Sequence, residues 1–210
     1  MPAAALHPSF EFGSFVRIVF IGPPGAGKGT QCELLSKALN VPHIGTGGML
    51  RALEPESGEQ IHVRIDRGHF APDEFVLQMV AERLAQSDSQ MGYLLDGFPR
   101  TQVQASAFDD QLMAASLKLD HVLHLQVSAD VLIERLRKRG EEGNRADDAE
   151  EFIRERFRIY EARTAPLLDH YRSQELVRDI DASDSESLVH ASICECLNFN
   201  PMLSKPVAND

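Results

Sequence analysis

The chain has 210 residues, 43% of them hydrophobic, which suits one domain with a proper core. Its formal net charge of -11 at pH 7 argues against nonspecific nucleic-acid binding, so a polyphosphate ligand would need a locally positive pocket. No run approaches the ~18 apolar residues of a membrane helix, and residues 1–15 lack the basic residues of a signal peptide. We therefore expect a cytoplasmic protein. A reducing compartment also fits the three cysteines, which form no Cys-x-x-Cys pair: Cys32, Cys194 and Cys196.

A glycine-rich loop with one lysine follows the first predicted strand, Val16–Ile21. Gly22, Gly27 and Lys28 fit the Gly-x4-Gly-Lys pattern, in which backbone N–H groups point at phosphate oxygens and the lysine adds a charge. The next residues have helical spacing, and a helix N-terminus also favours an anion. Gly29 stands where many such loops carry the serine or threonine that binds magnesium, so a metal here needs another anchor.

Apolar β-branched runs alternate with helical patterns along the rest of the chain, which predicts a parallel sheet in an α/β fold. Further strands are predicted at 43–44, 93–95, 121–127 and 176–180. Helices are predicted at 46–53, 59–67, 73–85, 102–115, 130–139, 148–171 and 186–197. Gly140 is expected to end the helix before it, and 54–58 to be a short connection. Ligands of such sheets bind at the carboxyl ends of the strands, where the glycine-rich loop also lies.

A carboxylate and a guanidinium follow the strand at 93–95, in the string Asp96-Gly97-Phe98-Pro99-Arg100-Thr101. Asp96 can hold magnesium through water, and Arg100 can fork onto phosphate oxygens. An aspartate before a glycine is also a common turn former. Because this string lies at another strand end, two phosphate-handling groups are expected to converge beside the loop.

On these two segments and on Asn144-Arg145-Ala146-Asp147-Asp148, the chain resembles the adenylate kinase family over about residues 17–197. The resemblance implies a P-loop three-layer fold with a five-stranded parallel sheet. The core would lie in residues 16–197, with an AMP-binding flap at about 45–74 and a short lid at about 139–148. Residues 1–15 and 198–210 would be an extension and a tail. The implied reaction is reversible, Mg²⁺-dependent transfer of a phosphoryl group from ATP to AMP, giving two ADP, by a monomer that binds neither nucleic acid nor membrane.

The resemblance also implies a role for individual residues. Lys28 would contact the donor phosphates, and Asp96 would orient the water shell of Mg²⁺. The implied ATP-binding residues are Gly25, Ala26, Gly27, Lys28, Gly29, Thr30, Arg135 and Arg139. The implied AMP-binding residues are Thr46, Arg51, Gly97, Arg100, Gln104, Arg145 and Arg156. The implied catalytic residues are Lys28, Arg100, Arg139, Arg145 and Arg156. These arginines agree with the chemistry, since phosphoryl transfer needs mainly positioning and positive charge.

Thr46 and Gln104 favour AMP as the acceptor, because a glutamine amide can both donate to and accept from an adenine edge. The chain departs from the family pattern, which has serine, aspartate and a pair of smaller aliphatic residues at the positions of Gly45, Gly48 and Phe70-Ala71. We therefore expect weaker or broader acceptor use. Two alternatives stay open: a related kinase that accepts UMP or CMP, and a catalytically weak nucleotide-binding homologue. A nucleotide-switch GTPase does not fit, because the sequence has no Asn-Lys-x-Asp string.

Overall fold

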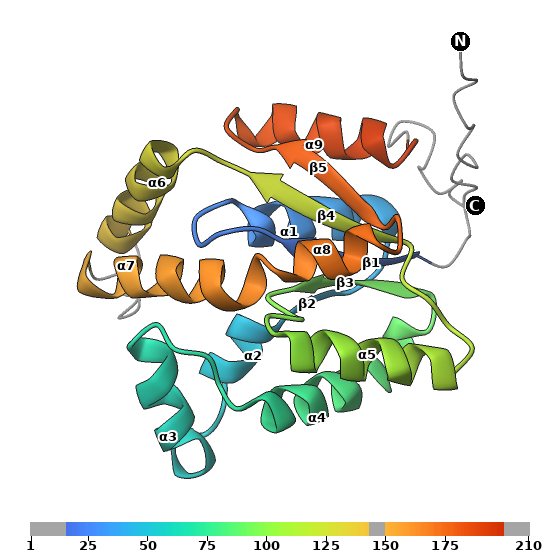
Figure 1. Cartoon of the computed structure of the whole chain (residues 1–210), viewed down its shortest axis with the longest axis horizontal. Helices are drawn as coiled ribbons and strands as arrows, with labels where there is room; N and C mark the ends of the chain where they lie inside the picture. The colour runs from blue at the N-terminus through green and yellow to red at the C-terminus, as the bar shows by residue number, and fades with distance from the viewer. Residues whose placement is uncertain (1–15, 143–149, 200–210) are drawn as a thin grey trace, which may run out of the picture.

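The computed structural model describes residues 16–142 and 150–199 (Figure 1). Five strands form one parallel sheet in the order β2-β3-β1-β4-β5. Their bounds are β1 Val16–Ile21, β2 His43–Gly45, β3 Gly92–Asp96, β4 His121–Gln126 and β5 Val177–Asp181. The predicted five-stranded parallel sheet is confirmed, including the very short second strand.

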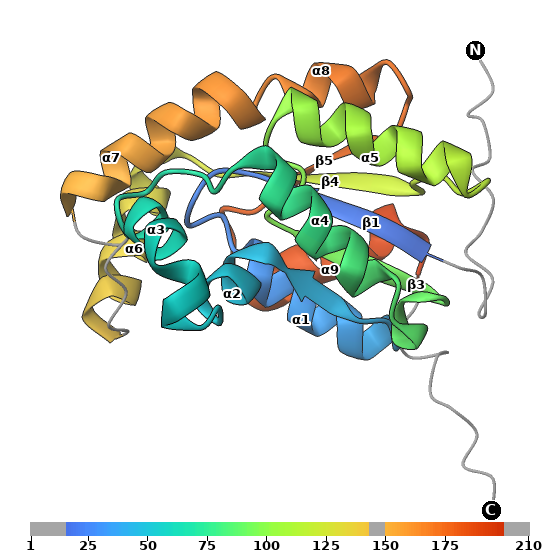
Figure 2. The same ribbon diagram turned by 90° about the horizontal axis from the view of Figure 1, so that it is seen from below.

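Helices cover both faces of this sheet (Figures 1 and 2). Their bounds are α1 Lys28–Leu39, α2 Thr46–Arg51, α3 Pro55–Asp66, α4 Asp73–Leu84, α5 Gln102–Ala114, α6 Ala129–Glu142, α7 Glu150–Ile159, α8 Leu167–Arg172 and α9 Glu186–Cys196. Short 3₁₀ and π turns lie at Ser87–Ser89 and Tyr160–Thr164. Within the described parts of the chain, none of the helices has the length and apolar character needed to cross a membrane.

Three sequence predictions about these helices are wrong. The segment 54–58 is not a connection, because α3 already begins at Pro55, and a proline in the first turn of a helix forfeits no intrahelical hydrogen bond. Gly140 does not end α6, which continues to Glu142; glycine inside a helix costs only about 1 kcal/mol, and glutamates that follow it favour the helix. The single helix predicted at 148–171 is divided by the π turn and by Pro166, which precedes α8 and has no N–H to donate.

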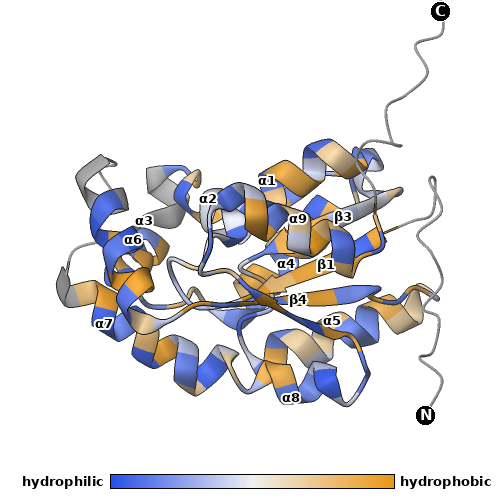
Figure 3. Ribbon diagram, turned by 90° about the horizontal axis from the view of Figure 1, so that it is seen from above, coloured by the Kyte–Doolittle hydropathy of each residue, from blue (hydrophilic) through white to orange (hydrophobic). Residues whose placement is uncertain are grey.

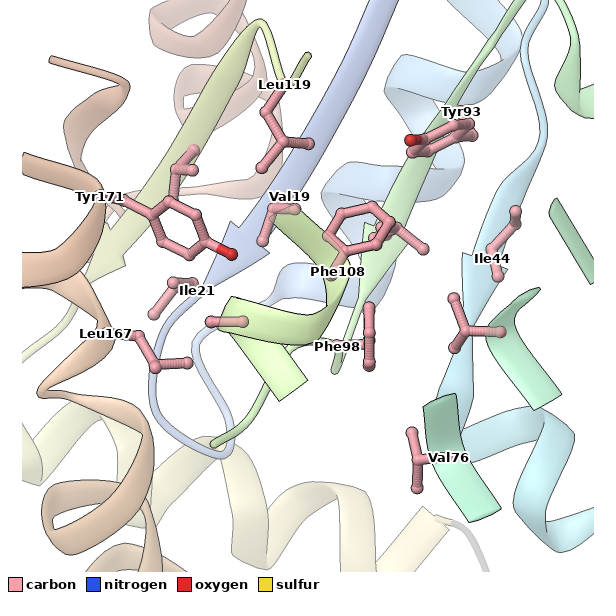
Figure 4. Close-up of a cluster of buried hydrophobic side chains, with 14 of the residues drawn as sticks. Val19, Ile21, Ile44, Val76, Tyr93, Phe98, Phe108, Leu119, Leu167 and Tyr171 are labelled. Atoms are coloured by element: carbon pink, nitrogen blue, oxygen red, sulfur yellow. The ribbon is translucent and has the colours of Figure 1, made fainter. Parts of the chain in front are cut away.

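The two faces of the sheet carry two separate apolar cores, because successive residues of a strand point to opposite faces. Val19 and Ile21 of β1 pack with residues of α4, α5 and α8, among them Phe108 and Tyr171 (Figure 4). Ile18 and Phe20 pack on the other face with residues of α1 and α9. Figure 3 shows the apolar residues gathered on the strands and on the helix sides that face them. The buried β1 thus supplies a rigid base for the loop that follows it.

The carboxyl ends of β1, β2 and β3 meet at one edge of the sheet. Asp96, at the end of β3, is paired in register with Phe20 of β1 and with Gly45 of β2. Beyond this edge lie α3, α6 and α7, which project away from the sheet (Figures 1 and 2). Segments distant in the sequence therefore face one another across this edge.

Candidate active site

The loop between β1 and α1 follows a path that only glycine accepts. Gly25 has φ of +85°, and a Cβ there would lie 3.0 Å from Leu136 Cγ. Gly22 also has no room for a side chain, because a Cβ there would lie 2.9 Å from the Leu125 carbonyl oxygen. This close packing against β4 and α6 holds the backbone of the loop at the edge of the sheet. The loop leads directly into the N-terminus of α1.

Lys28, the first residue of α1, folds back over this loop. Its Nζ donates hydrogen bonds to the carbonyl oxygens of Gly22 at 2.8 Å and Pro23 at 2.9 Å. Burial lowers the pKa of Lys28 to about 8; the carboxylate of Asp96 opposes this shift, and the guanidinium charges of Arg100 and Arg156 add to it. The ammonium group is thus a partly desolvated positive charge, and an anionic ligand bound beside it would stabilise its charged form.

The carboxylate of Asp96 lies beside the start of α1. A Cβ at position 29 would lie 3.3 Å from Asp96 Oδ2, so Gly29 leaves room for that oxygen. Burial acts to raise the pKa of Asp96, but His43, Lys28 and Arg100 outweigh it and hold the pKa below its ordinary value. His43 Nε2 is 3.6 Å from Asp96 Oδ2, which is long for a hydrogen bond and is best described as an electrostatic contact. Asp96 is therefore an ionised carboxylate at neutral pH.

Oxygen ligands of this kind suit Mg²⁺, which usually keeps several waters and is held by one or two carboxylates together with substrate phosphates. In the described residues no group of three or more His, Cys, Asp or Glu side chains forms a ready cage for a metal. The half-buried carboxylate of Asp96 beside the predicted phosphate loop suits a metal that a nucleotide carries. The residues present therefore fit Mg²⁺ held through water by Asp96.

A second group of predicted site residues gathers around Gly97. The Thr46 hydroxyl donates to the Gly97 carbonyl oxygen at 2.8 Å, and Arg100 Nε donates to the same oxygen at 2.7 Å. Gly97 has φ of +79°, and a Cβ there would lie 2.7 Å from Arg100 Nη2 and 2.8 Å from Thr46 Oγ1. Arg51, at the end of α2, lies against Gly47. The end of β3 and the helix α2 thus bring one hydroxyl and two guanidinium groups to the same region.

Gln104 is buried, with only 2% of its surface exposed. Its Oε1 accepts a hydrogen bond from the Arg100 N–H at 2.7 Å, and its Nε2 donates to Asp73 Oδ1 at 2.8 Å. The residue also lines a small cavity of about 20 Å³ together with Thr46 and Phe70. Contact between Gln104 and a base therefore requires this cavity to widen.

The predicted arginines have different surroundings. The Arg135 guanidinium donates to the carbonyl oxygens of Ala182 and Asp184, at 2.8 and 3.1 Å, in the loop after β5. Arg156 of α7 covers the chain at Gly68, where a Cβ would lie 2.8 Å from Arg156 Cγ. The side chain of Arg139 and the whole of Arg145 lie outside the described residues.

One cavity of about 820 Å³ is lined by most of these groups, and its size is that of a ligand site. Thr46, Gly97 and Gln104 line the small neighbouring cavity instead. The predicted residues that line the larger cavity are Gly25, Ala26, Gly27, Lys28, Gly29, Thr30, Arg51, Asp96, Arg100, Arg135 and Arg156. The lining residues that sequence analysis missed include His43, which faces Asp96, and residues of the segment after β5, which lie beside Arg135: Ala182, Asp184, Ser185 and Glu186. His43 lies there because β2 pairs with β3. The sequence predicts a strand at 43–44, but it does not show which strand is its neighbour.

Known proteins are similar to this chain over most of its length. The family model described as adenylate kinase matches residues 20–176. The chain is 91% identical over 184 residues to the adenylate kinase of Rhodopirellula baltica, covering 88% of this chain and 96% of that protein. It is 46% identical to the adenylate kinase of Corynebacterium urealyticum, over 85% of this chain and 98% of the relative. The identity to the adenylate kinase of a Cyanothece strain is 44%, over 84% and 92% of the two chains.

Proposed function

The chain belongs to the adenylate kinase family and is an ATP:AMP phosphotransferase, and on that premise we propose that the cavity of about 820 Å³ is its active site. The observation that carries the proposal is the convergence of Lys28, Asp96 and Arg100 on this cavity at one edge of the sheet. These are a phosphate-binding cation, a carboxylate suited to a hydrated metal and a guanidinium that can fork onto a phosphate. Phosphoryl transfer needs such groups held in fixed positions.

ATP binds with its phosphates on the loop between β1 and α1. The close packing of Gly22 and Gly25 lets backbone N–H groups approach the phosphate oxygens, and the N-terminus of α1 adds a favourable dipole. Lys28 Nζ exchanges its two carbonyl partners for phosphate oxygens. Gly27, Gly29, Thr30 and the neighbouring Ala26 complete the loop, and the Arg135 side chain borders the same end of the cavity.

Asp96 would hold Mg²⁺ through water, and the bound metal would neutralise charge on the ATP phosphates. The lowered pKa of Asp96 supports this role, because the carboxylate is ionised at neutral pH. Since Gly29 brings no side-chain oxygen, Asp96 takes over the anchoring that a serine or threonine supplies in many phosphate loops.

AMP binds on the side of the cavity formed by α2 and the end of β3. Arg51 and Arg100 hold its phosphate, while Thr46, Gly97 and Gln104 face its base once the small cavity around Gln104 widens. An oxygen of the AMP phosphate then forms a bond to the γ-phosphorus as the bond from that phosphorus to the β-phosphate oxygen breaks, so both products are ADP. Negative charge on the transferred phosphoryl group is stabilised by the guanidinium groups of Arg139, Arg145 and Arg156.

The flap at about 45–74 and the short lid at about 139–148 close over the two nucleotides and exclude water, which would otherwise take the phosphoryl group. The position of α3, α6 and α7 beyond the edge of the sheet supports this division of the core domain 16–197 (Figure 2). We also propose a monomeric, cytoplasmic protein that needs neither nucleic acid nor a membrane. The net charge of -11 and the buried free thiols of Cys32 and Cys194 support this.

The test is ADP formation from ATP and Mg²⁺ with AMP, dAMP, CMP, UMP and GMP as acceptors, together with the variant Arg100→Ala. We expect AMP to have the highest kcat/KM, and Arg100→Ala to raise the KM for AMP about tenfold or more with little change in the KM for ATP. A preference for UMP or CMP would overturn the choice of acceptor. An Arg100→Ala variant with an unchanged KM for AMP would overturn the assignment of the acceptor site.

A further inference from the structure

Phe70, in the connection from α3 to α4, lies against the guanidinium of Arg100. Arg100 Cζ is 5.2 Å from the centroid of the Phe70 ring, and Arg163 Cζ is 5.9 Å from the same centroid. Both distances are within the range of a cation–π interaction. Arg64 Nε of α3 donates a hydrogen bond to the Phe70 carbonyl oxygen at 3.0 Å, so the backbone of this residue is anchored as well.

Arg100 is held by its backbone at one end and by its Nε at the other. Its N–H donates to Gln104 Oε1, and its carbonyl oxygen accepts from the hydroxyl of Thr164, which belongs to the π turn. Nε donates to the Gly97 carbonyl oxygen. The hydrogen bond at Nε fixes one edge of the planar guanidinium, and the ring of Phe70 packed over Cζ adds a contact to the face of the group. An aliphatic side chain at position 70 would fill space but offers no negative π face to the cation.

We propose that Phe70 is a positioning residue for Arg100: its ring face holds the guanidinium in the pose that receives the phosphate of the acceptor nucleotide. This inference rests on the proposed role of Arg100 in the acceptor site. It also gives a reason for the departure at position 70 from the smaller aliphatic residue usual in the family.

The second guanidinium at the ring belongs to the same arrangement. Arg163 comes from the π turn at Tyr160–Thr164, and its Nη2 lies 3.7 Å from Asp73 Oδ2. Asp73 Oδ1 accepts from Gln104 Nε2, so the carboxylate that balances Arg163 also fixes the glutamine beside Arg100. The aromatic ring and this carboxylate together allow two cations to lie close to each other. Phe70, between α3 and α4, therefore contacts both Arg100 and the π turn through Arg163.

The test is steady-state kinetics of Phe70→Leu, Phe70→Tyr and the matched control Phe75→Leu, each with AMP and with ATP varied. Phe75 of α4 packs against the apolar core of the same region and undergoes the same change of side chain. We expect Phe70→Leu to raise the KM for AMP about three- to tenfold, the size of a partly desolvated cation–π interaction, with the KM for ATP within about twofold of the parent. Phe70→Tyr keeps the ring face and should have the same KM for AMP as the parent protein.

The same comparison in an Arg100→Ala background identifies what Phe70 acts through. Without the guanidinium, Phe70→Leu should change the KM for AMP no further. An Arg100→Ala variant with normal kinetics would overturn the proposed function, and the inference with it. If Arg100→Ala is impaired but Phe70→Leu is not, only the inference is wrong. It is also wrong if Phe75→Leu matches Phe70→Leu, if Phe70→Tyr fails to rescue, or if the effect of Phe70→Leu persists without Arg100.

Discussion

Replacing Lys28 by methionine should remove most of the turnover and yet leave the protein at least as stable at neutral pH. The substitution keeps an unbranched side chain of similar length and removes only the ammonium group. That group has two partners in the structure, the carbonyl oxygens of Gly22 and Pro23, and both belong to the loop that binds the donor phosphates in the proposed function. The same ammonium charge therefore favours catalysis and lowers the stability of the folded protein.

The size of each effect can be worked out. A group that stabilises developing charge on the transferred phosphoryl contributes on the order of 3 kcal/mol, a loss of about a hundredfold or more in kcat. Burial lowers the pKa of Lys28 from 10.5 to about 8, and one pKa unit corresponds to about 1.4 kcal/mol. Because the lysine borders an open cavity, the cost of charging it in the folded protein is at most about 3 kcal/mol. The two lost hydrogen bonds offset about 1 kcal/mol each.

The effect of Lys28 on stability should depend on pH. Between pH 8 and 10.5 the unfolded chain keeps the Lys28 proton that the folded protein has lost, so the free energy of unfolding increases as pH rises. Below about pH 8 the lysine is charged in both states, and the full cost of burying that charge lowers the stability of the folded protein. The parent should therefore gain stability relative to Lys28→Met between pH 8 and 10.5, in urea unfolding followed at several pH values.

Turnover is measured by coupled detection of ADP formed from ATP, AMP and Mg²⁺, with urea unfolding of the same preparations. A Lys28→Met variant with near-normal kcat would refute the role of the ammonium group. A variant that loses more than about 2 kcal/mol of stability at pH 7 would refute the argument that its charge is costly in the folded protein.

Four further substitutions test the geometry of the cavity. Gly97→Ala adds a Cβ within 2.8 Å of Arg100 and Thr46 at a φ of +79°, so kcat/KM for AMP should fall more than tenfold, or the protein should lose about 2 kcal/mol or more in urea unfolding. At Gly48, inside α2, a Cβ meets no atom within 4 Å, and Gly48→Ala should raise the free energy of unfolding by about 0.5–1 kcal/mol. Gly48→Asp should lower the KM for AMP if this glycine weakens acceptor binding, and unchanged acceptor constants would contradict that reasoning. Arg135→Ala releases the loop after β5 and should raise the KM for ATP several-fold with that for AMP unaffected.

Much of the fold and of the donor side of the site could be predicted from the sequence because it depends on local patterns. The apolar run of β1, the glycine spacing up to Lys28 and the helical spacing of α1 follow one another within a short stretch of chain. The strand end at Asp96 is local in the same way. The rule that parallel strands end at one edge then brings the two segments together without knowledge of side-chain packing. The five-stranded sheet follows from the same alternation of strands and helices.

Helix bounds were less predictable where two local signals compete. Pro55 and Gly140 both read as breaks in a helix, yet one occupies the first turn of α3 and the other lies inside α6. In each case the intrinsic cost is at most about 1 kcal/mol, and the rest of the helix outweighs it. The π turn at Tyr160–Thr164 has no such signal in the sequence.

The amino-acid order was enough to identify the family and to predict a phosphate loop and a metal-binding carboxylate, because each rests on residues adjacent in the chain. The surroundings of those residues depend on tertiary packing. His43 reaches Asp96 through strand pairing, Gln104 is buried through the contact of α5 with α4, and Phe70 meets Arg100 because α3 leads back to the edge of the sheet. Such contacts join segments far apart in sequence, and their distances are set by how helices and strands pack, which no periodicity in the chain encodes.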